Sequence, residues 1–305
     1  MHGLDTADTH HTSNSFVIDA GGAVYFQEGT FHHTQVESPW GPPRRVANGA
    51  VFRYEPRAQK FDVYVSFGFA NPHGHVFDRW GQDFVWDGTG AQPYHAVLFS
   101  GSVDFPNKHA APPQVYKQRT RPCSGVEVLS SRHFPEDFQG NLLVNNVIGF
   151  QGILRYKMQD QDASFTAVEA DPIVSSTDPN FRPADVEIGP DGAIWFTDPT
   201  FGILGYYEGH KADSENKPAV YRVDGKTGKI AMMADDIPGP NGLAFSPDGK
   251  KLYVVASRAE PNRAIVAYDV LNGGSKLGKG KVFIDAGKGG SPDGFRVDVD
   301  GNLWC

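Results

Sequence analysis

The sequence predicts an all-β fold, a six-bladed β-propeller with an incomplete last blade, on three observations. A hairpin pattern, two alternating apolar runs around a glycine turn, recurs six times along the 305 residues. Between successive copies there is room for a second strand pair, which gives four strands to each repeat of about 50 to 60 residues. No segment keeps the 3.6-residue apolar period of a helix. Residues 1–305 are therefore expected to form a single propeller domain.

The repeats define where each blade begins. Four copies are clear and two are weaker. In the clear copies an Asp-Gly or Gly-Gly pair stands between two runs of alternating apolar residues, and glycine supplies the positive φ that a two-residue hairpin turn needs. The copies, and hence the expected blades, start near residues 14, 73, 124, 184, 241 and 293.

The sixth copy differs from the others in length. It ends at Cys305 after about two strands, whereas the other repeats have room for four. An incomplete blade leaves unpaired strand edges, which favour association with other chains. Two interpretations follow: a ring that closes imperfectly, or a fragment of a longer chain.

Composition excludes several classes of protein. A net charge of −8 argues against a nucleic-acid partner, which requires a basic face. No apolar stretch approaches the ~18–20 residues of a transmembrane segment. The N-terminus lacks the basic and apolar regions of a signal peptide, so the chain is expected to be cytoplasmic as it stands, and periplasmic if N-terminally truncated. Two cysteines, Cys123 and Cys305, cannot make a disulfide framework or a four-cysteine zinc site.

The predicted site lies where the first strand of each blade starts. In a propeller these strands line the channel, and their starts share one mouth. Oxygen-bearing Asn and Asp side chains at such a mouth suit a hard cation such as Ca²⁺, and an Asp can also act as a general base. The alternative is that these side chains only satisfy local backbone N–H groups. Aligning the repeats places Asn14, His73, Ser124, Ala184, Asn241 and Asp293 at these positions.

Three C-terminal segments resemble the gluconolactonase/regucalcin/luciferin-regenerating family of six-bladed propellers. They are FTDPTFGILGYYEG (196–209), GPNGLAFSPDGKKLYVVAS (239–257) and SPDGFRVDVDGNLWC (291–305). The motifs occur in the order and spacing of that family, and the resemblance covers about residues 184–305. It implies a calcium-dependent lactone hydrolase.

The resemblance also implies a set of site residues. In that family a divalent ion is held by a Glu of the first blade, the Asn of a PNG motif and the Asp of a PDG motif. The PNG asparagine is Asn241 and the PDG aspartate is Asp293, whereas the Glu position falls on Asn14, which keeps an oxygen but loses a charge. A substrate-contacting Asn falls on Ala184, next to Asp185. We therefore expect Asn14, Asn241 and Asp293 to bind Ca²⁺ or another divalent cation, Asp293 to activate water, and His73, Ser124, Arg182 and Asp185 to contact the substrate.

Residues 1–198 resemble a different group, the propeller of planctomycete-type membrane-bound dehydrogenases, which are similar to quinoprotein glucose dehydrogenase. FANPHGHVFDRWGQD (69–83) and RPCSGVEVLSSRHFPEDFQG (121–140) are among the segments that carry this resemblance. The two resemblances meet near residues 191–199. We interpret this as a crossover between two propeller lineages, a chimera of natural or engineered origin.

Three hypotheses for the function follow. The first is a calcium-dependent lactonase of gluconolactonase type, in which the ion polarises the carbonyl of a small-molecule or sugar-derived lactone and Asp293 helps to activate water. The second is a quinoprotein-type sugar dehydrogenase with His73, His75 and Arg182 as cofactor-binding cations. The third is a non-catalytic propeller that binds ligands or partners, which Asn14, Ala184 and the short last blade favour. The sequence leaves open the substrate, the oligomeric state and the compartment.

Overall fold

The computed structural model describes residues 3–8, 11–96, 102–118, 120–146, 148–206 and 209–305. The chain divides into two compact units. One comprises Met1–Cys123 and Gln159–Ala167, and the other comprises Ser124–Met158 and Val168–Cys305. Within the described residues nearly all regular structure is antiparallel β-sheet, and short 3-10 turns such as Phe201–Ile203 supply the helical content. The all-β fold of propeller type is confirmed.

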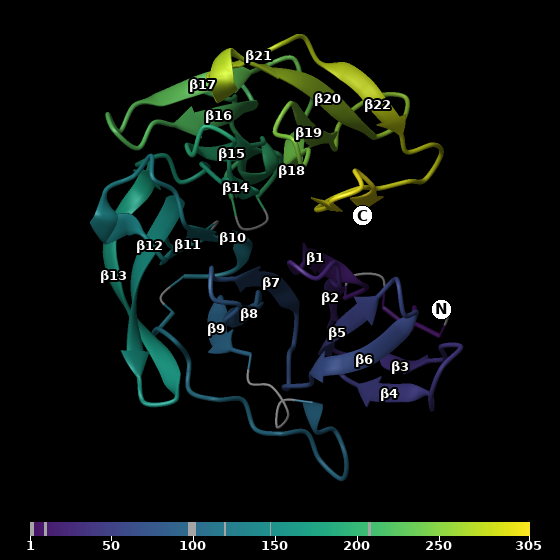
Figure 1. Ribbon diagram of the computed structural model, residues 1–305. Coiled ribbons are helices and arrows are strands. Elements are labelled where there is room, and N and C mark those ends of the chain that lie inside the picture. Colours follow the sequence, from purple (N-terminus) through teal and green to yellow (C-terminus); the bar gives the residue numbers. More distant parts are fainter. Residues whose placement is uncertain (1–2, 9–10, 97–101, 119, 147, 207–208) are drawn as a thin grey trace. The chain divides into compact units, whose positions relative to one another are not determined.

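The first unit contains two sheets and a hairpin. One sheet has the strand order β1-β2-β5-β6 and the other has the order β7-β8-β9. The hairpin β3–β4 is inserted between β2 and β5, and β4 lies beside β6 (Figure 1). The strands are β1 (Asn14–Ile18), β2 (Val24–Glu28), β3 (His33–Val36), β4 (Arg44–Ala47), β5 (Ala50–Glu55), β6 (Lys60–Val65), β7 (Pro72–Phe77), β8 (Asp83–Asp87) and β9 (Gln92–His95).

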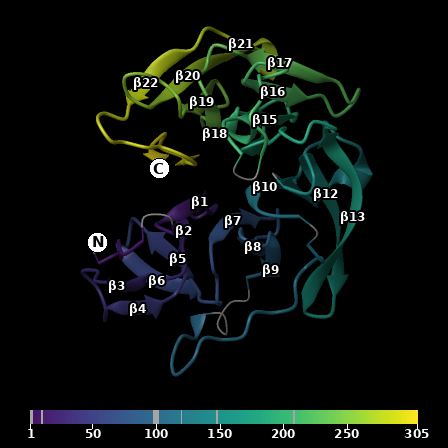
Figure 2. The ribbon, with the colours of Figure 1, turned by 180° about the vertical axis from the view of Figure 1, so that it is seen from behind.

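Three further sheets lie wholly or mostly in the second unit. Their strand orders are β10-β11-β12-β13, β14-β15-β16-β17 and β18-β19-β20-β21, and β22 also pairs with β20. Figure 2 shows the long strands β12 and β13 in teal, with β13 at the outer edge of its sheet. The strands are β10 (Cys123–Leu129), β11 (Asn141–Asn146), β12 (Gly152–Gln161), β13 (Ser164–Ser175), β14 (Val186–Ile188), β15 (Ile194–Asp198), β16 (Ala219–Val223), β17 (Ile230–Ala234), β18 (Pro240–Phe245), β19 (Lys251–Ala256), β20 (Ala264–Leu271), β21 (Lys276–Leu277) and β22 (Lys281–Asp285).

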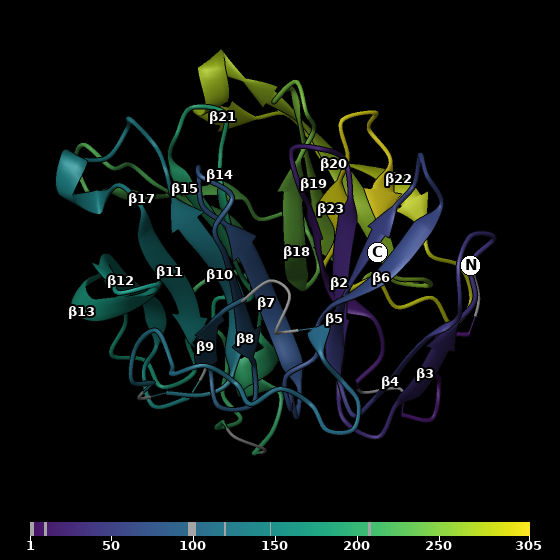
Figure 3. The same ribbon diagram turned by 60° about the horizontal axis from the view of Figure 1, so that its bottom comes forward.

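The chain ends in a two-stranded sheet. Strands β23 (Arg296–Val297) and β24 (Leu303–Trp304) pair with each other, and β23 lies beside β18 (Figure 3). The part of the chain that the structure describes thus forms five sheets of three or more strands, so a count of six blades is not confirmed. The assignment of residues 1–305 to one domain stays a prediction.

The predicted hairpin turns are confirmed. Gly192 joins β14 to β15 with a φ of 79°, and Gly301 joins β23 to β24 with a φ of 85°. Each donates its N–H to the carbonyl three residues earlier, over 2.8 Å from Gly192 and 3.0 Å from Gly301. A side chain at either position would be strained in this left-handed conformation, which is why the Asp-Gly pairs identified the turns in the sequence.

The core of the second unit lies between neighbouring sheets. Trp195 of β15 and Tyr268 of β20 are both fully buried, and one apolar cluster joins them to residues of β16, β18 and β19. A smaller cluster joins Phe295, just before β23, to β18, β19 and β20. The apolar faces that the alternating sequence provides therefore hold adjacent sheets together. The first cluster contains Ala193, Trp195, Val220, Ala234, Ile237, Leu243, Leu252, Val254, Ala256, Val266, Tyr268 and Leu277.

Candidate functional site

Asn241 and Asp293 are in direct contact in the second unit. Asn241 is the second residue of β18, and Asp293 precedes β23. The Nδ2 of Asn241 donates to the Oδ1 of Asp293 over 2.5 Å, and the N–H of Gly242 donates to the main-chain oxygen of Asp293 over 3.2 Å. Asp293 is exposed and Asn241 is partly exposed, so both can reach a ligand. The structure therefore brings together two of the three predicted metal-binding residues, although their role in metal binding or catalysis stays a prediction.

Local sequence explains why the pair forms. A Cβ at Gly242 would lie 2.3 Å from the main-chain oxygen of Asp293. The close approach of these two backbone segments therefore requires glycine at this position. The register of β18 against β19 also shifts between Pro240 and Leu243, a bulge that separates Asn241 from the regular ladder. Bulges of this kind redirect side chains at the ends of sheets.

Asp185 stabilises the same end of the sheets through the backbone. Its Oδ1 accepts the N–H of Val186 and its Oδ2 accepts the N–H of Leu243, each over 2.9 Å. Ala184, before it, donates its N–H to Thr197 and is 8% exposed. These bonds favour a structural role for Asp185, and its predicted contact with substrate stays a prediction.

Ser124 and Arg182 lie in the same unit, in contact with loops. Ser124 donates its hydroxyl to the main-chain oxygen of Pro183 over 2.6 Å. The side chain of Arg182 lies against Gly202. A Cβ added at Gly202 would be 2.7 Å from the Nε of Arg182. The backbone of Arg182 hydrogen-bonds to Asp198. Burial raises the pKa of the Asp198 carboxyl to about 7. Direct substrate contact by Ser124 or Arg182 stays a prediction.

Asn14 and His73 belong to the first unit. The Nδ2 of Asn14 donates to the main-chain oxygen of Thr12 over 2.9 Å, and its Oδ1 is buried without a hydrogen-bond partner among the described residues. The Nδ1 of His73 lies 3.4 Å from the hydroxyl of Ser15, and its main-chain oxygen accepts the thiol of Cys123. Their predicted place in one ring with Asn241 and Asp293 stays a prediction.

The donor set fits a divalent cation by its chemistry. Asp293 offers a carboxylate, and Asn241 offers the amide oxygen beside the Nδ2 that donates to Asp293. The Oδ1 of Asn14, which has no hydrogen-bond partner in the described residues, belongs to the first unit, and its place in the same site stays a prediction. Ala184 supplies no ligand, and the described residues contain no group of three or more His, Cys, Asp or Glu side chains arranged for a metal. A single carboxylate predicts weak affinity, because site charge sets Ca²⁺ affinity.

Three charged residues that the sequence analysis did not identify meet in the second unit. The Nη1 of Arg296 in β23 lies 3.1 Å from the Oε1 of Glu187 in β14, and Glu127 in β10 interacts electrostatically with both. Burial raises the pKa of Glu127 to about 7 and that of Glu187 to about 8. One guanidinium balances one carboxylate, so the two carboxyl groups retain a proton between them toward neutral pH. The repeat register could have identified these three residues in the sequence. Each stands three residues after a predicted site position, Ser124, Ala184 or Asp293.

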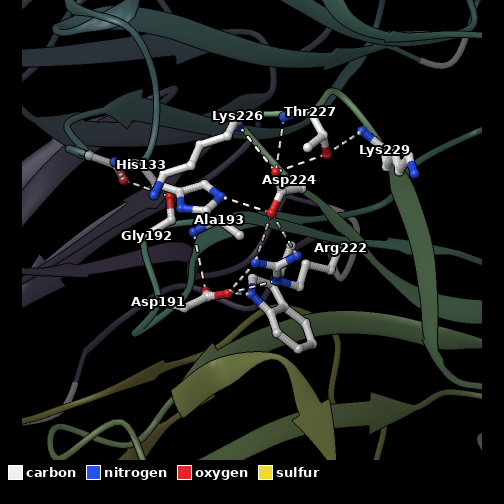
Figure 4. Close-up of polar contacts among 11 residues, drawn as sticks. His133, Asp191, Gly192, Ala193, Arg222, Asp224, Lys226, Thr227 and Lys229 are labelled. Atoms are coloured by element: carbon white, nitrogen blue, oxygen red, sulfur yellow. Dashed lines mark hydrogen bonds and ion pairs between the residues drawn. The ribbon is translucent and has the colours of Figure 1, made fainter. Parts of the chain in front are cut away.

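A second polar network occurs at the hairpin turn between β14 and β15 (Figure 4). Asp191 accepts hydrogen bonds from Arg222 over 2.7 Å and from the N–H of Ala193. Asp224 lies 3.2 Å from the Nε2 of His133 and 3.5 Å from Arg222. His133 lies between β10 and β11, so the network ties the turns of two neighbouring sheets together.

Comparison with known proteins identifies the family. Residues 132–305, more than half of the chain, match the model described as SMP-30/Gluconolactonase/LRE-like region. The chain therefore belongs to the SMP-30/Gluconolactonase/LRE-like family. This match begins earlier than the predicted start near residue 184. Residues 1–205 match a second model, described as Domain of unknown function (DUF7133), and the resemblance of residues 1–198 to dehydrogenase propellers stays a prediction.

Individual relatives include a gluconolactonase and a lactonohydrolase. A gluconolactonase of Zymomonas mobilis is 35% identical over 130 residues, which cover 40% of this chain and 35% of the relative. The lactonohydrolase oryL of Aspergillus oryzae is 31% identical over 140 residues, covering 39% and 31%. The alignments thus span about a third of these curated relatives. The solved regucalcin of Agrobacterium tumefaciens, described as a calcium-binding protein, is 22% identical with a TM-score of 0.50, covering 76% of this chain and 66% of that one, and shows a shared fold.

In the described part of the chain, no helix is both long enough and apolar enough to cross a membrane.

Proposed function

We propose that the chain is a lactonase-type hydrolase that opens a small-molecule, sugar-derived lactone at the Asn241–Asp293 pair. The observation that carries the proposal is the 2.5 Å contact between these side chains at the exposed end of β18. It places a carboxylate and an amide on one surface, reached from two different sheets. The gluconolactonase and lactonohydrolase relatives support the choice of a lactone as substrate.

Asp293 would act as the base of the reaction. Its carboxylate accepts a proton from a water molecule as the water oxygen bonds to the lactone carbonyl carbon. The ring C–O bond then breaks, and the proton passes to the leaving oxygen, which gives a hydroxy acid. Asn241 holds the Asp293 carboxylate in place and offers a hydrogen-bonding group to the substrate.

A divalent cation such as Ca²⁺ would be held by Asp293, Asn241 and Asn14. When bound, such an ion polarises a carbonyl and lowers the pKa of water. His73, Ser124, Arg182 and Asp185 remain proposed substrate contacts.

The experiment is the hydrolysis of gluconolactone by the purified chain, followed as acid release with the spontaneous rate subtracted. We expect a rate above background that a chelator abolishes and that added Ca²⁺ restores. A rate equal to background with and without Ca²⁺ would contradict the proposal. A rate that persists in chelator would support the hydrolase activity and contradict the proposed role of the divalent cation.

The structure does not favour the dehydrogenase alternative. His75, one of its three expected cofactor cations, is 2% exposed and its Nε2 lies 3.4 Å from the Oδ2 of Asp83. Tyr25 and Phe77 pack against its ring with centroids 5.3 and 4.8 Å away. A ring enclosed in this way has no free face for a cofactor, so we do not advance oxidation as a second function.

A further inference from the structure

The segment that carries Asp293 ends in a hairpin whose side-chain hydrogen bonds gather on Asp298, five residues beyond Asp293. Strands β23 and β24 have two residues each, and their ladder pairs Arg296 with Trp304 and Val297 with Leu303. A two-stranded sheet of this size is not stable by itself in water. The position of Asp293 against Asn241 therefore depends on what anchors this segment to the other sheets.

Phe295 is the apolar anchor. Its side chain is 2% exposed and packs with Ala244, Val255 and Ile265, from β18, β19 and β20. Removing an aromatic side chain of this size from water is strongly favourable. Because apolar contacts are non-directional, this anchor fixes how deeply the segment sits but not how its polar groups are oriented.

Arg296 is a directional anchor. Successive strand residues point to opposite faces, so it leaves the segment on the face opposite to Phe295. Its Nη1 lies 3.1 Å from the Oε1 of Glu187 and also donates to the main-chain oxygen of Phe295 over 3.0 Å. The side chains of Arg296 and Glu187 are 26% and 17% exposed, so solvent screens the pair less than a surface ion pair. Asp185, just before β14, and Glu127 of β10 add weaker attractions.

We propose that Arg296 is a positioning residue: paired with Glu187 and attracted by Asp185 and Glu127, it fixes the orientation of the segment that presents Asp293 to Asn241. This inference rests on the proposed function for its catalytic consequence. The guanidinium is suited to the task because it presents several donors in a rigid plane, which one ammonium group does not.

The test compares Arg296→Gln and Arg296→Lys with a matched control, Arg222→Gln. Arg222 also forms an ion pair, 2.6 Å from Asp191, at the turn between β14 and β15. The first readout is amide hydrogen exchange of residues 293–297, which requires no substrate. We expect Arg296→Gln to raise this exchange about tenfold and Arg296→Lys to raise it less, since local opening reports local stability. The control should lower the melting temperature and leave this exchange unchanged.

The second readout is kinetic. With gluconolactone, Arg296→Gln should lower kcat by about tenfold with little change in KM, as a loss of transition-state alignment requires. Unchanged exchange at residues 293–297 in Arg296→Gln, or equal acceleration in Arg222→Gln, would overturn the proposal, as would rapid exchange with a wild-type kcat. If Arg296→Gln does not fold, Arg296→Lys decides by the same criteria. If the unmodified chain hydrolyses no lactone, the proposed function fails while the exchange result still decides whether Arg296 orients the segment.

Discussion

The hydroxyl of Thr197 donates a hydrogen bond to the main-chain oxygen of Asn241 over 2.8 Å. Thr197 is fully buried near the end of β15, and its own main-chain oxygen accepts the N–H of Ala184. The hydroxyl oxygen of Thr197 also accepts the N–H of Asp185 over 3.2 Å, so this one buried residue links the segment before β14, the end of β15 and the start of β18. The backbone from which Asn241 reaches Asp293 is consequently fixed by the preceding sheet.

Replacing Thr197 by valine tests this link. Thr197→Val removes the hydroxyl and leaves the oxygen of Asn241 without that donor, so we expect a loss of about 1–2 kcal/mol in the free energy of unfolding. Lactone hydrolysis should fall as well, because Asn241 loses its support. Urea denaturation and the gluconolactone assay measure the two effects. Thr197→Ser keeps the hydroxyl and is the matched control; equal losses in both variants would contradict the link.

Glycine at position 242 allows the segment of Asp293 to approach β18. In Gly242→Ala the new Cβ would lie 2.3 Å from the main-chain oxygen of Asp293, so strand β18 and the segment of Asp293 must move apart. We expect hydrolysis to fall about a hundredfold, since a shift of about 1 Å at a reacting group has effects of that size. Gly205→Ala is the control, because no heavy atom lies within 4 Å of its added Cβ. Full activity in Gly242→Ala would show that the close approach is not needed.

Glu187 makes stability depend on pH. Burial raises its pKa from 4.5 to about 8, so between these values the folded chain binds the proton more tightly than the unfolded chain does. Its contribution is complete below about pH 4.5 and is lost as the pH rises through about 8. Glu127 and Asp198, both with raised pKa values of about 7, act in the same direction.

The corresponding variant is Glu187→Gln, which does not ionise. We expect the melting temperature of the unmodified chain to fall between pH 5 and pH 8.5, and that of Glu187→Gln to fall less steeply. Glu136→Gln, at an exposed position in a 3-10 turn, is the control and should keep the original slope. Parallel curves for Glu187→Gln and the unmodified chain would show that Glu187 titrates normally.

The network around Asp191 stabilises the turns of two sheets. Arg222 and Asp191 are 12% and 10% exposed and lie 2.6 Å apart, so Arg222→Ala leaves a shielded carboxylate without its cation. We expect a loss of roughly 2–3 kcal/mol in the free energy of unfolding, less than for a fully buried pair. The exposed pair of Lys217 and Asp235 provides the contrast, and Lys217→Ala should leave stability unchanged. Similar losses in the two variants would contradict the difference in burial.

The sequence was most informative where local chemistry decides the structure. Asp-Gly pairs identified the turns at Gly192 and Gly301 because few other residues adopt that conformation. The repeat register also brought Asn241 and Asp293 to one place across 52 residues, because equivalent strand starts lie at equivalent ends of neighbouring sheets. The number of blades was harder to predict, since it depends on pairing between strands of only two residues.

Contacts between sheets explain what the sequence did not reveal. Glu127, Glu187 and Arg296 are individually ordinary charged residues, and only their packing makes them a partly buried cluster. Both oxygens of Asp185 accept backbone N–H groups, one of them from β18, and the sequence did not indicate these bonds; its contact with substrate stays a prediction. A sequence pattern shows which side chains share a register, but not which backbone donors they meet.

The most direct test of the account is the rate of gluconolactone hydrolysis by Asp293→Asn beside that of Asp300→Asn. Both residues are exposed and belong to the same terminal segment, but only Asp293 contacts Asn241. We predict that Asp293→Asn loses about a hundredfold or more in kcat with an unchanged melting temperature, as removal of a general base requires, and that Asp300→Asn keeps its activity. A folded Asp293→Asn variant that hydrolyses the lactone at the original rate would contradict the account.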